Sequence, residues 1–554
     1  MVMINRRDFL HLAGYSTLLS TPLFQGCDSN DSSNEASSTQ SEPDWSPLTA
    51  NDTETPFEVR VEGYIPTALQ GGTLYRNGPG LYERQGIKRA NFIDGDGYVT
   101  ALKFNNQSNA SFQGRFVRTT KYKQEAATDK FLNDTWATLV PDLPVEQSLI
   151  QDNSANQSSV STVWFNQHLY SFDESAPPYR LNPETLETEQ LGGEQFNAIY
   201  AAHSKIDSVN GDWIHFGLQY GNPEATTTAE AGHVLMHISI IDQYESTTKY
   251  YKRIDLSAID QQLTSLGRGV YIHDFFATEN FLVFYLPPVF IDLRSLGSNA
   301  RQFGLEEKPL TGCFQWIPAL GGKILLFSRH NPNLDPIMLD VPESSAKGFW
   351  HVFNAYEQNQ RIICDFIAYN DFNSLLDREN SVLYTLMEGK RGQLTSEGAL
   401  ARYILSFSQI DSQTGMPINA NVQYQLLESN FGFEFPVINR HYETRKHRYG
   451  YAAFDYKDYS GLFHGIAKYD FETNNLQKHD FGENYFCAEP VFCPDPSHQA
   501  EDAGWLIVTV YDALEKQSFI AILNAQDIIA APTAKIYLGR ALSVHLHGFW
   551  RAAD

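Results

Sequence analysis

Short runs of apolar and aromatic residues, separated by polar turns, recur along most of the chain. Runs of this kind, rich in β-branched and aromatic residues and bounded by turn residues, predict β-strands. Representative examples are Trp213–Tyr220, Phe281–Leu286 and 505–511. Helix-like stretches are few and short, and the best candidate covers residues 256–266. The pattern therefore predicts an all-β body.

One polar turn recurs between the predicted strands. It follows the end of a strand and contains Asp or Asn with Glu and Thr, as at 180–185, 241–246, 410–415 and 469–474, with a looser relative at 523–527. Successive turns fall roughly 60 residues apart, except that the second and third are separated by near three times that distance. Repeats of this size indicate a β-propeller. Over the body this spacing gives about seven blades. Generic hairpin turns in a large β-sandwich are the alternative.

The composition is that of a large globular protein with a sizeable apolar core. Of 554 residues, 42% are hydrophobic and 13% are aromatic, and large all-β folds of this length can form one domain. The formal net charge of −25 at pH 7 argues against binding nucleic acid and against docking on anionic lipid through basic patches. No apolar run reaches the roughly 18 residues that a membrane-spanning helix needs.

Residues 1–27 have the pattern of an export signal, which is excluded from the fold. Arg6-Arg7-Asp8-Phe9-Leu10 resembles a twin-arginine motif, and Leu23-Phe24-Gln25-Gly26-Cys27 resembles a bacterial lipobox, in which the cysteine is lipidated after cleavage. We therefore expect an exported protein at the periplasmic face or in the cell envelope, held at the membrane by a lipid anchor on Cys27. A plain cleaved signal is the alternative.

Residues 28–50 are rich in Ser, Asn, Asp, Glu and Gln and carry few large apolar side chains. A segment of this composition cannot bury enough surface to fold. We interpret it as a disordered tether, followed by a single β-propeller domain over residues 51–554.

The cysteines beyond Cys27 do not form a metal-binding pattern. Cys313, Cys364, Cys487 and Cys493 include no Cys-x-x-Cys pair, so a zinc knuckle is not expected. The last two could pair in an oxidising compartment or remain buried free thiols, and the sequence does not choose between these outcomes.

Four histidines far apart in the chain are candidates for a metal centre: His203, His273, His351 and His547. Each lies in a strand-like segment rich in aromatic residues, and the intervals between them are of whole-blade size. Neutral imidazole suits iron, zinc, copper and nickel. Four neutral ligands would leave a divalent ion its full charge, and such a site can keep positions open for dioxygen.

Convergence of these histidines depends on the propeller geometry, because its innermost strands approach one axis and bring separate blades together. Taken singly, a histidine on an apolar strand is more often a hydrogen-bonded core residue. Other pairs, such as His233 with His237 or His441 with His447, are rival metal sets.

Several motifs in a fixed order resemble the carotenoid cleavage oxygenase family, which includes the retinal-pigment-epithelium isomerase and the lignostilbene dioxygenases. The resemblance runs through nearly the whole body. It is carried by Leu74-Tyr-Arg-Asn-Gly-Pro-Gly80, Asp94-Gly-Asp-Gly97, Ala202-His-Ser-Lys-Ile-Asp207, Glu434-Phe-Pro-Val-Ile-Asn439, Glu489-Pro-Val-Phe-Cys493, Asp502-Ala-Gly-Trp-Leu506, Val510-Tyr-Asp512, Ile522-Leu-Asn-Ala-Gln-Asp527 and His547-Gly-Phe-Trp550.

The resemblance implies a seven-bladed β-propeller with iron(II) on its axis, with loops and a few short helices capping the metal-bearing face. The implied iron ligands are His203, His273, His351 and His547, and no acid–base residue is needed beyond the metal centre. The family pattern places its ligand directly before Gly and an aromatic end, which selects His547 over His545.

Glutamates that orient the imidazoles are also implied, at Glu174, Glu434 and Glu489. A carboxylate that accepts the far N–H of a ligand fixes the tautomer of the ring and raises its basicity. Glu434 and Glu489 lie in strong motifs, whereas Glu174 depends only on its spacing before the turn at 182–185.

One segment departs from the family pattern. Many relatives carry an aromatic, histidine-rich lead-in before Asp94-Gly95-Asp96-Gly97, where this chain has Asn91-Phe92-Ile93, so the identity of the substrate is in doubt. The glycines of this motif are expected to take positive φ in a hairpin turn. Lignostilbene-type enzymes hold a substrate phenol with Tyr and Lys, and Tyr98 with Lys121 or Lys123 are conceivable counterparts.

The sequence therefore predicts an iron(II) dioxygenase that cleaves a conjugated double bond of a carotenoid, apocarotenoid or stilbene-like substrate, using dioxygen, into two carbonyl products. A family isomerase on the same iron site and a non-enzymatic propeller lipoprotein are the alternatives. The scissile bond and the oligomeric state are not determined by the sequence.

Overall fold

The computed structural model describes residues 43–553 except 47–49, 54, 141–155, 175, 192–199, 221–232, 245, 246, 260–266 and 298. The predicted signal with its Cys27, and most of the predicted tether, lie outside the described residues. Pro43–Asp554 forms one compact unit.

Five blades of the predicted propeller are separate four-stranded antiparallel sheets. Apolar and β-branched side chains fill both faces of most inner strands, which is why these runs read as nearly continuous hydrophobic segments. The strands are β7 (Ser161–Phe165), β8 (His168–Phe172), β9 (Tyr179–Leu181) and β10 (Thr188–Leu191); β11 (Ser204–Ile206), β12 (Trp213–Tyr220), β13 (Val234–Ile241) and β14 (Thr248–Asp255); β16 (Phe276–Ala277), β17 (Phe281–Leu286), β20 (Gly322–Ser328) and β21 (Ile337–Val341); β22 (Val352–Glu357), β23 (Arg361–Ala368), β24 (Ala399–Ser406) and β27 (Asn421–Glu428); and β28 (Gly432–Val437), β29 (Tyr449–Asp455), β30 (Gly465–Asp470) and β31 (Asn475–Asp480).

The other two blades share one ten-stranded sheet. One blade contains β32 (Tyr485–Cys487), β33 (Val491–Pro494), β34 (Gly504–Asp512), β35 (Gln517–Asn524) and β36 (Ala534–Tyr537), and the other contains β2 (Thr73–Pro79), β5 (Gly97–Asn106), β6 (Asn109–Phe116) and β37 (His547–Arg551). Strand β1 (Phe57–Gly63) joins them, because its first half pairs with β6 and its second half with β36. These seven blades confirm the predicted fold.

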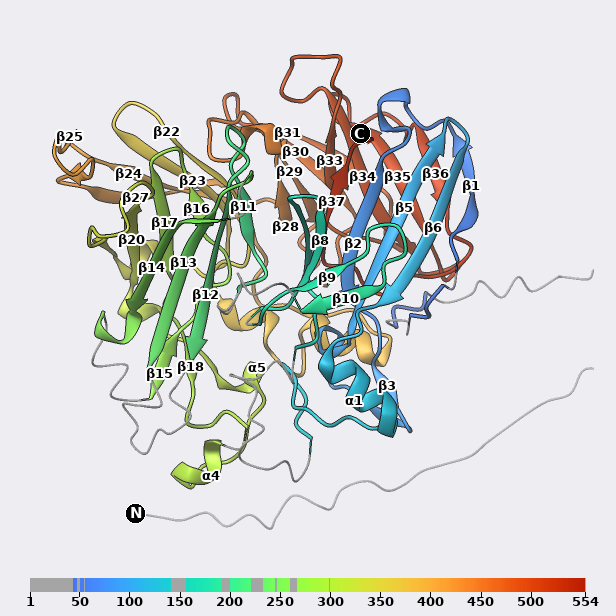
Figure 1. Ribbon diagram of the computed structural model, residues 1–554, viewed down its shortest axis with the longest axis horizontal. Coiled ribbons are helices and arrows are strands. Elements are labelled where there is room, and N and C mark those ends of the chain that lie inside the picture. The colour runs from blue at the N-terminus through green and yellow to red at the C-terminus, as the bar shows by residue number, and fades with distance from the viewer. Residues whose placement is uncertain are drawn as a thin grey trace, which may run out of the picture. The chain divides into compact units, whose positions relative to one another are not determined.

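The last strand of the chain closes the ring by pairing with one of the first. Strand β37 runs antiparallel to β2, with His547 opposite Asn77 and Arg551 opposite Thr73. Figure 1 shows the outcome: the blue N-terminal strands lie beside the red C-terminal ones. The two ends of the body are therefore held by a shared sheet.

The short helices gather on one side of the blades (Figure 1). They are α1 (Thr120–Thr128), α4 (Asn299–Phe303), α5 (Leu310–Cys313) and α6 (Val382–Thr385), together with single 3-10 turns such as η2 (Phe92–Asp94), η9 (Phe372–Leu375) and η10 (Leu386–Glu388). Of the helix expected over 256–266, the structure describes only the 3-10 turn Leu256–Ala258. Among the described residues, no helix is both long and apolar enough to cross a membrane.

Smaller sheets complete the described part of the chain. They are the hairpin of β3 (Glu83–Arg84) and β4 (Ile87–Lys88), the sheet of β15 (Arg268–Val270), β18 (Val289–Asp292) and β19 (Phe314–Trp316), and the hairpin of β25 (Gln409–Ile410) and β26 (Pro417–Ile418).

The recurring polar turns connect neighbouring strands, and a shared hydrogen-bond pattern explains their sequence. Asn182 Oδ1 accepts from the backbone N–H groups of the second and third residues after it. Asp411 and Asp470 do the same in their own turns. Asp and Asn favour such turns because their side chains replace a backbone acceptor. The repeat therefore reflects hairpin chemistry within the blades.

The glycines of the motif at 94–97 are explained by close packing, and the prediction of positive φ was wrong. Gly95 has φ −72°. A Cβ on Gly97 would lie 2.0 Å from the carbonyl oxygen of Ser158, so the strand could not approach its neighbour with any larger residue. The four cysteines described are all buried and free, so Cys487 and Cys493 do not pair.

The segment before β1 is packed on the body where it is described. Trp45 is buried, and the backbone N–H of Asp44 donates to the carbonyl oxygen of Ala513 at 2.9 Å. Trp45 contacts a cluster that includes Leu386 and Leu462.

Asn77 joins the closing blade to the blade of β7 and β8. Its Nδ2 lies 3.0 Å from Ser158 O, 3.1 Å from Ser161 O and 3.1 Å from Ser171 Oγ, and the side chain is fully buried. Replacing Asn77 by Ala leaves buried acceptors without a donor, so we expect Asn77→Ala to lower the free energy of unfolding by at least about 2 kcal/mol. Denaturant unfolding measures this.

Asn105, on the neighbouring strand β5, is the matched control, because its side chain is exposed and bonds only Asn109. We expect Asn105→Ala to change the free energy of unfolding by less than about 0.5 kcal/mol. Equal effects of the two substitutions would contradict the proposed role of Asn77 in ring closure.

Candidate metal centre

The four predicted histidines all lie at the beginning of an innermost strand. His203 directly precedes β11, His351 directly precedes β22, His547 is the first residue of β37, and His273 lies three residues before β16. The first strands of neighbouring blades contact one another, as β37 does with both β7 and β33. Each histidine is thus delivered to the axis by a different blade.

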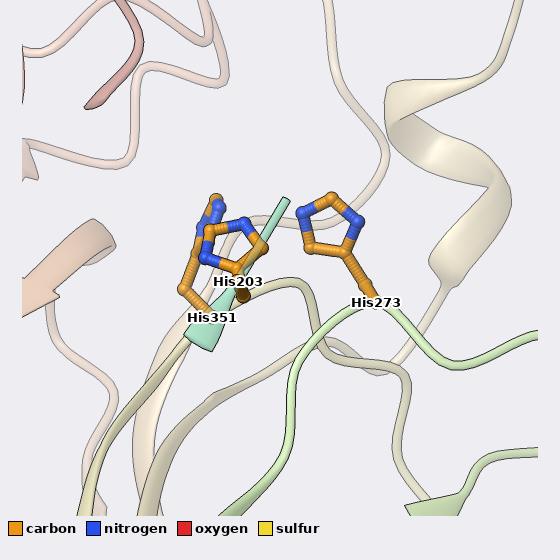
Figure 2. A group of neighbouring side chains, drawn as sticks. All are labelled: His203, His273 and His351. Atoms are coloured by element: carbon orange, nitrogen blue, oxygen red, sulfur yellow. The ribbon is translucent and has the colours of Figure 1, made fainter. Parts of the chain in front are cut away.

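The imidazole rings gather into one group. The centroid of the His203 ring lies 4.7 Å from that of His273, 4.9 Å from that of His351 and 4.7 Å from that of His547. The His351 ring lies 5.1 Å from His273 and 4.8 Å from His547. Figure 2 shows His203, His273 and His351 arriving from separate segments of the chain. The predicted convergence is therefore present.

The group fits a metal ion by its donor atoms. One ring nitrogen each of His203, His273 and His351 lies within 4.8 Å of the others. Nε2 of His203 and Nε2 of His351 are buried and have no hydrogen-bond partner in the protein. Buried polar atoms are rarely left unpaired, and a metal ion would use both lone pairs.

Burial keeps two of the rings neutral. It lowers the pKa of His203 and of His273 well below the usual value, and repulsion between neighbouring imidazoles lowers both further. A neutral ring has the free lone pair that coordination requires. The pocket therefore favours the ligand form of these two side chains.

Glu434 orients His351. Its Oε2 lies 2.5 Å from Nδ1 of the ring, and its other oxygen accepts from the hydroxyl of Tyr369 at 3.2 Å. Burial opposes protonation of His351, yet the charge and hydrogen bond of Glu434 outweigh it and raise the pKa of the ring. The bond fixes Nδ1 on the carboxylate and leaves Nε2 for the centre.

Glu489 does the same for His547. Its Oε1 lies 2.9 Å from Nδ1 of the ring, and its Oε2 accepts from the backbone N–H of Gly548 at 3.0 Å. Arg76 lies 3.6 Å from Oε2 and also donates to the carbonyl oxygen of Glu489. Burial opposes ionisation, but His547 and Arg76 together lower the pKa of Glu489. This carboxylate is therefore held in its charged form.

Glu174 is placed beside His273, in a weaker arrangement. Its Oε1 lies 3.3 Å from Nδ1 of the ring without forming a hydrogen bond. The hydroxyl of Tyr271 lies closer, 2.7 Å from the same nitrogen. Burial raises the pKa of Glu174 well above its usual value, and the charges of Asp173 and Asp274 raise it further. His203 forms no such pair with a carboxylate among the contacts described.

The alternative histidines lie elsewhere. His545 is buried, but it lines a separate small cavity with Trp45 and Tyr511, and burial lowers its pKa to about 3. His233 bonds Asp255 and His237 bonds Tyr251. The structure therefore places His547 at the centre and not His545.

The centre separates two cavities of opposite character. On one side lies an apolar cavity of about 1270 Å³ including its mouth, lined by His273, His351 and His547 and by side chains such as Trp136, Trp350 and Leu383. On the other side a smaller cavity is polar, and Lys205, Asp274, Arg440 and Glu443 line it together with His203. A ligand of low polarity would approach from the first side.

The segment that departs from the family pattern faces the apolar cavity, because Phe92 and Ile93 line it. The suggested phenol-binding residues do not. Lys121 is buried and donates to Asp96 at 2.6 Å and to Glu125 at 3.0 Å, and Tyr98 donates to the carbonyl oxygen of Asn51. The network fixes helix α1, so this suggestion was wrong for Tyr98 and Lys121; Lys123 is exposed.

Sequence reasoning missed Tyr271, Tyr369 and Arg76, which contact the glutamates or histidines of the centre. Tyr271 carried a usable signal, since residues two apart in extended chain share a side and His273 follows at that spacing. Arg76 lies inside the motif 74–80. Tyr369 had no local signal, because its partner Glu434 is distant in sequence.

Comparisons with known proteins agree over nearly the whole chain. The family model described as retinal pigment epithelial membrane protein (RPE65) matches residues 46–552. The apocarotenoid-15,15'-oxygenase of Synechocystis sp. is 30% identical over 499 residues, covering 88% of this chain and 92% of that protein. The isoeugenol monooxygenase of Pseudomonas putida is 26% identical over 517 residues, covering 90% and 95%.

Solved structures show the same architecture. Cobalt-substituted Synechocystis apocarotenoid oxygenase superposes with a TM-score of 0.74 at 27% identity, covering 91% of this chain and 97% of that one. A chimera of that oxygenase with RPE65 gives a TM-score of 0.74 at 26% identity, again covering 91% and 97%.

Substitution of Glu434 or Glu489, which hydrogen-bond a histidine, should lower metal affinity more than substitution of Glu174. Loss of the charge that supports a ligand typically weakens metal binding about 10- to 100-fold. We expect this from Glu434→Gln, and a smaller effect from Glu174→Gln, because Glu174 makes no hydrogen bond to His273. Competition with a chelator for Fe²⁺ or Co²⁺ under anaerobic conditions measures both.

The exposed Glu388, which pairs with Lys390, is the matched control, and Glu388→Gln should leave affinity unchanged. If Glu174→Gln weakened metal binding as much as Glu434→Gln, the geometric distinction would be wrong.

Proposed function

The chain belongs to the family of the retinal pigment epithelial membrane protein, the carotenoid cleavage oxygenases, and we propose that it is a non-haem iron(II) dioxygenase. Its reaction is the cleavage of a conjugated carbon–carbon double bond, in a carotenoid, apocarotenoid or stilbene-like substrate, to two carbonyl products. The observation that carries the proposal is the convergence of four imidazoles, two of them buried and two half-buried, beside a large apolar cavity.

The donor set supports iron(II). Four neutral nitrogen ligands suit a divalent first-row metal, and a similar protein of known structure takes cobalt in place of its metal. When bound, iron(II) supplies the activation of dioxygen for addition to an electron-rich double bond. The orienting carboxylates offset part of the metal charge from outside the ligand set.

The protein contributes position and exclusion of water. Glu434 and Glu489 each hold one imidazole, those of His351 and His547, in one tautomer and one orientation. These two rings therefore need no rearrangement when substrate binds. The cavity wall presents mainly apolar side chains to the substrate. Such a wall removes water from the double bond and aligns an elongated molecule with the centre.

The two alternatives predict different chemistry. An isomerase on the same iron would convert its substrate without consuming dioxygen. A non-enzymatic propeller would need neither metal nor dioxygen. Oxygen consumption together with paired carbonyl products therefore distinguishes the proposed function from both.

Incubation with an apocarotenal, a hydroxystilbene and isoeugenol tests the proposal. We expect dioxygen to be consumed in proportion to substrate, with two carbonyl products seen by mass spectrometry. His351→Ala should lose stoichiometric iron and lower the rate at least about 100-fold, because the metal provides several kcal/mol of activation.

His498 is the matched control, because its side chain is exposed on the surface; His498→Ala should keep both iron and activity. Turnover without oxygen consumption would favour the isomerase. Full activity of His351→Ala would contradict the metal-based proposal.

We also propose that the protein is exported and anchored by a lipid on Cys27, from the twin-arginine-like and lipobox-like residues. An anchor would place the enzyme where apolar polyenes partition. We expect the full chain to enter the detergent phase on Triton X-114 partitioning, and Cys27→Ser to enter the aqueous phase. Replacing Arg6 and Arg7 by Lys should block export, seen by cell fractionation. Aqueous partitioning of the unaltered protein would contradict the anchor.

A further inference from the structure

Two carboxyl groups, those of Glu397 and Asp455, line the apolar cavity away from the histidines. Neither belongs to the metal centre or to the carboxylates that orient it. An ionisable group in an apolar wall is costly unless it has a polar partner, so these two residues call for an explanation.

Glu397 is the less satisfied of the two. Both of its carboxyl oxygens are inaccessible to solvent, and neither makes a hydrogen bond of good geometry with a described residue. The nearby backbone amide of Tyr459 lowers its pKa, but burial dominates and raises it to about 7. At neutral pH this carboxyl can therefore both donate and accept a hydrogen bond.

Asp455 is almost fully buried at the end of β29 and is partly satisfied. It accepts from the backbone N–H of Tyr456 at 2.7 Å and from Ser460 Oγ at 3.2 Å. Burial, together with Asp458, raises its pKa to about 8. Arg391 faces Asp458 and His464 instead. The cavity thus meets two carboxyl groups whose pKa values are raised, so that near neutral pH a large share of each is protonated.

The local backbone brings the two groups together. Gly432 pairs with Asp455 across β28 and β29. A Cβ on Gly432 would lie 2.7 Å from Oε2 of Glu397, so the missing side chain makes room for that carboxyl. Because residue 432 is glycine, the carboxyl group of Glu397 can lie against strand β28 at the position that pairs with Asp455 of β29.

The same strand fixes the distance to the metal centre. Glu434, which bonds His351, follows Gly432 by two residues on β28 and shares its face. Two residues of strand cover about 7 Å. Tyr369 spans the interval, since it donates to Glu434 and the charge of Glu397 contributes to raising its pKa. Glu397 therefore lies beside the residue of β28 that is two positions before Glu434, the carboxylate that orients His351.

We propose that Glu397, supported by Asp455, binds the hydroxyl group of a phenol-bearing substrate and so aligns the adjacent double bond with the metal centre. The inference rests on the proposed function and specifies its substrate class. Gly398, Gly432 and Gly461 also line this cavity, and Gly432 lies next to Glu397. Glu397 is a specificity residue in this arrangement.

Binding of two matched probes tests the proposal without any turnover. Affinities of the full-length protein for trans-4-hydroxystilbene and trans-4-methoxystilbene are measured by fluorescence titration in the absence of dioxygen. We expect the hydroxylated probe to bind at least about tenfold more tightly, which corresponds to about 1.4 kcal/mol. Glu397→Leu should abolish this preference, and Glu397→Gln, whose amide still bonds a hydroxyl, should keep part of it.

Leu376→Met, a change in the apolar wall, is the control and should shift both probes alike. Equal affinity of the unaltered protein for the two probes would overturn the inference, as would a preference that survives in Glu397→Leu. If circular dichroism shows that Glu397→Leu does not fold, the inference is tested by the affinities of the unaltered protein and of Glu397→Gln for the two probes. The binding test uses no oxygen, so its result does not depend on whether the protein cleaves any substrate. Failure of this inference can therefore be told apart from failure of the proposed function.

Discussion

The pairing of the last strand with β2 is the constraint on which the rest of the structure depends. It places His547 opposite Asn77, and therefore brings a histidine from the end of the chain to the three histidines from its middle. Arg76, the neighbour of Asn77, reaches Glu489, which in turn bonds His547. The same few residues therefore both close the ring and position His547.

Charge balance explains why the centre needs its surroundings. Four neutral imidazoles bring no compensation for a divalent ion, and a buried uncompensated charge is costly. Glu434 and Glu489 supply negative charge through hydrogen bonds to Nδ1 of His351 and His547, and leave Nε2 of each ring free for a metal ion. Glu174 stands at the third histidine without the same bond, and Tyr271 occupies its place. The orienting groups are therefore not equivalent.

The sequence allowed prediction of the blades and of the four histidines that converge, since both depend on patterns that repeat or resemble a family. His203 and His351 are recognisable because they directly precede strands with strong patterns. Contacts between distant residues were less accessible: nothing near Tyr369 points to Glu434. Lys121 was suggested as a counterpart of the phenol-binding lysine of lignostilbene-type enzymes, and the sequence does not reveal that Asp96 and Glu125 already pair with it.

The position of the centre between two unlike cavities has a physical consequence. Apolar walls on one side make transfer of a hydrocarbon from water favourable, while Lys205, Asp274, Arg440 and Glu443 keep the other side polar. A polyene or stilbene therefore gains by entering only from the first side, which limits how its double bond can face the imidazoles. Within that side, a carboxyl group such as that of Glu397 would discriminate between ligands that supply a hydrogen-bond partner and ligands that do not, because a buried polar group left unpaired costs free energy.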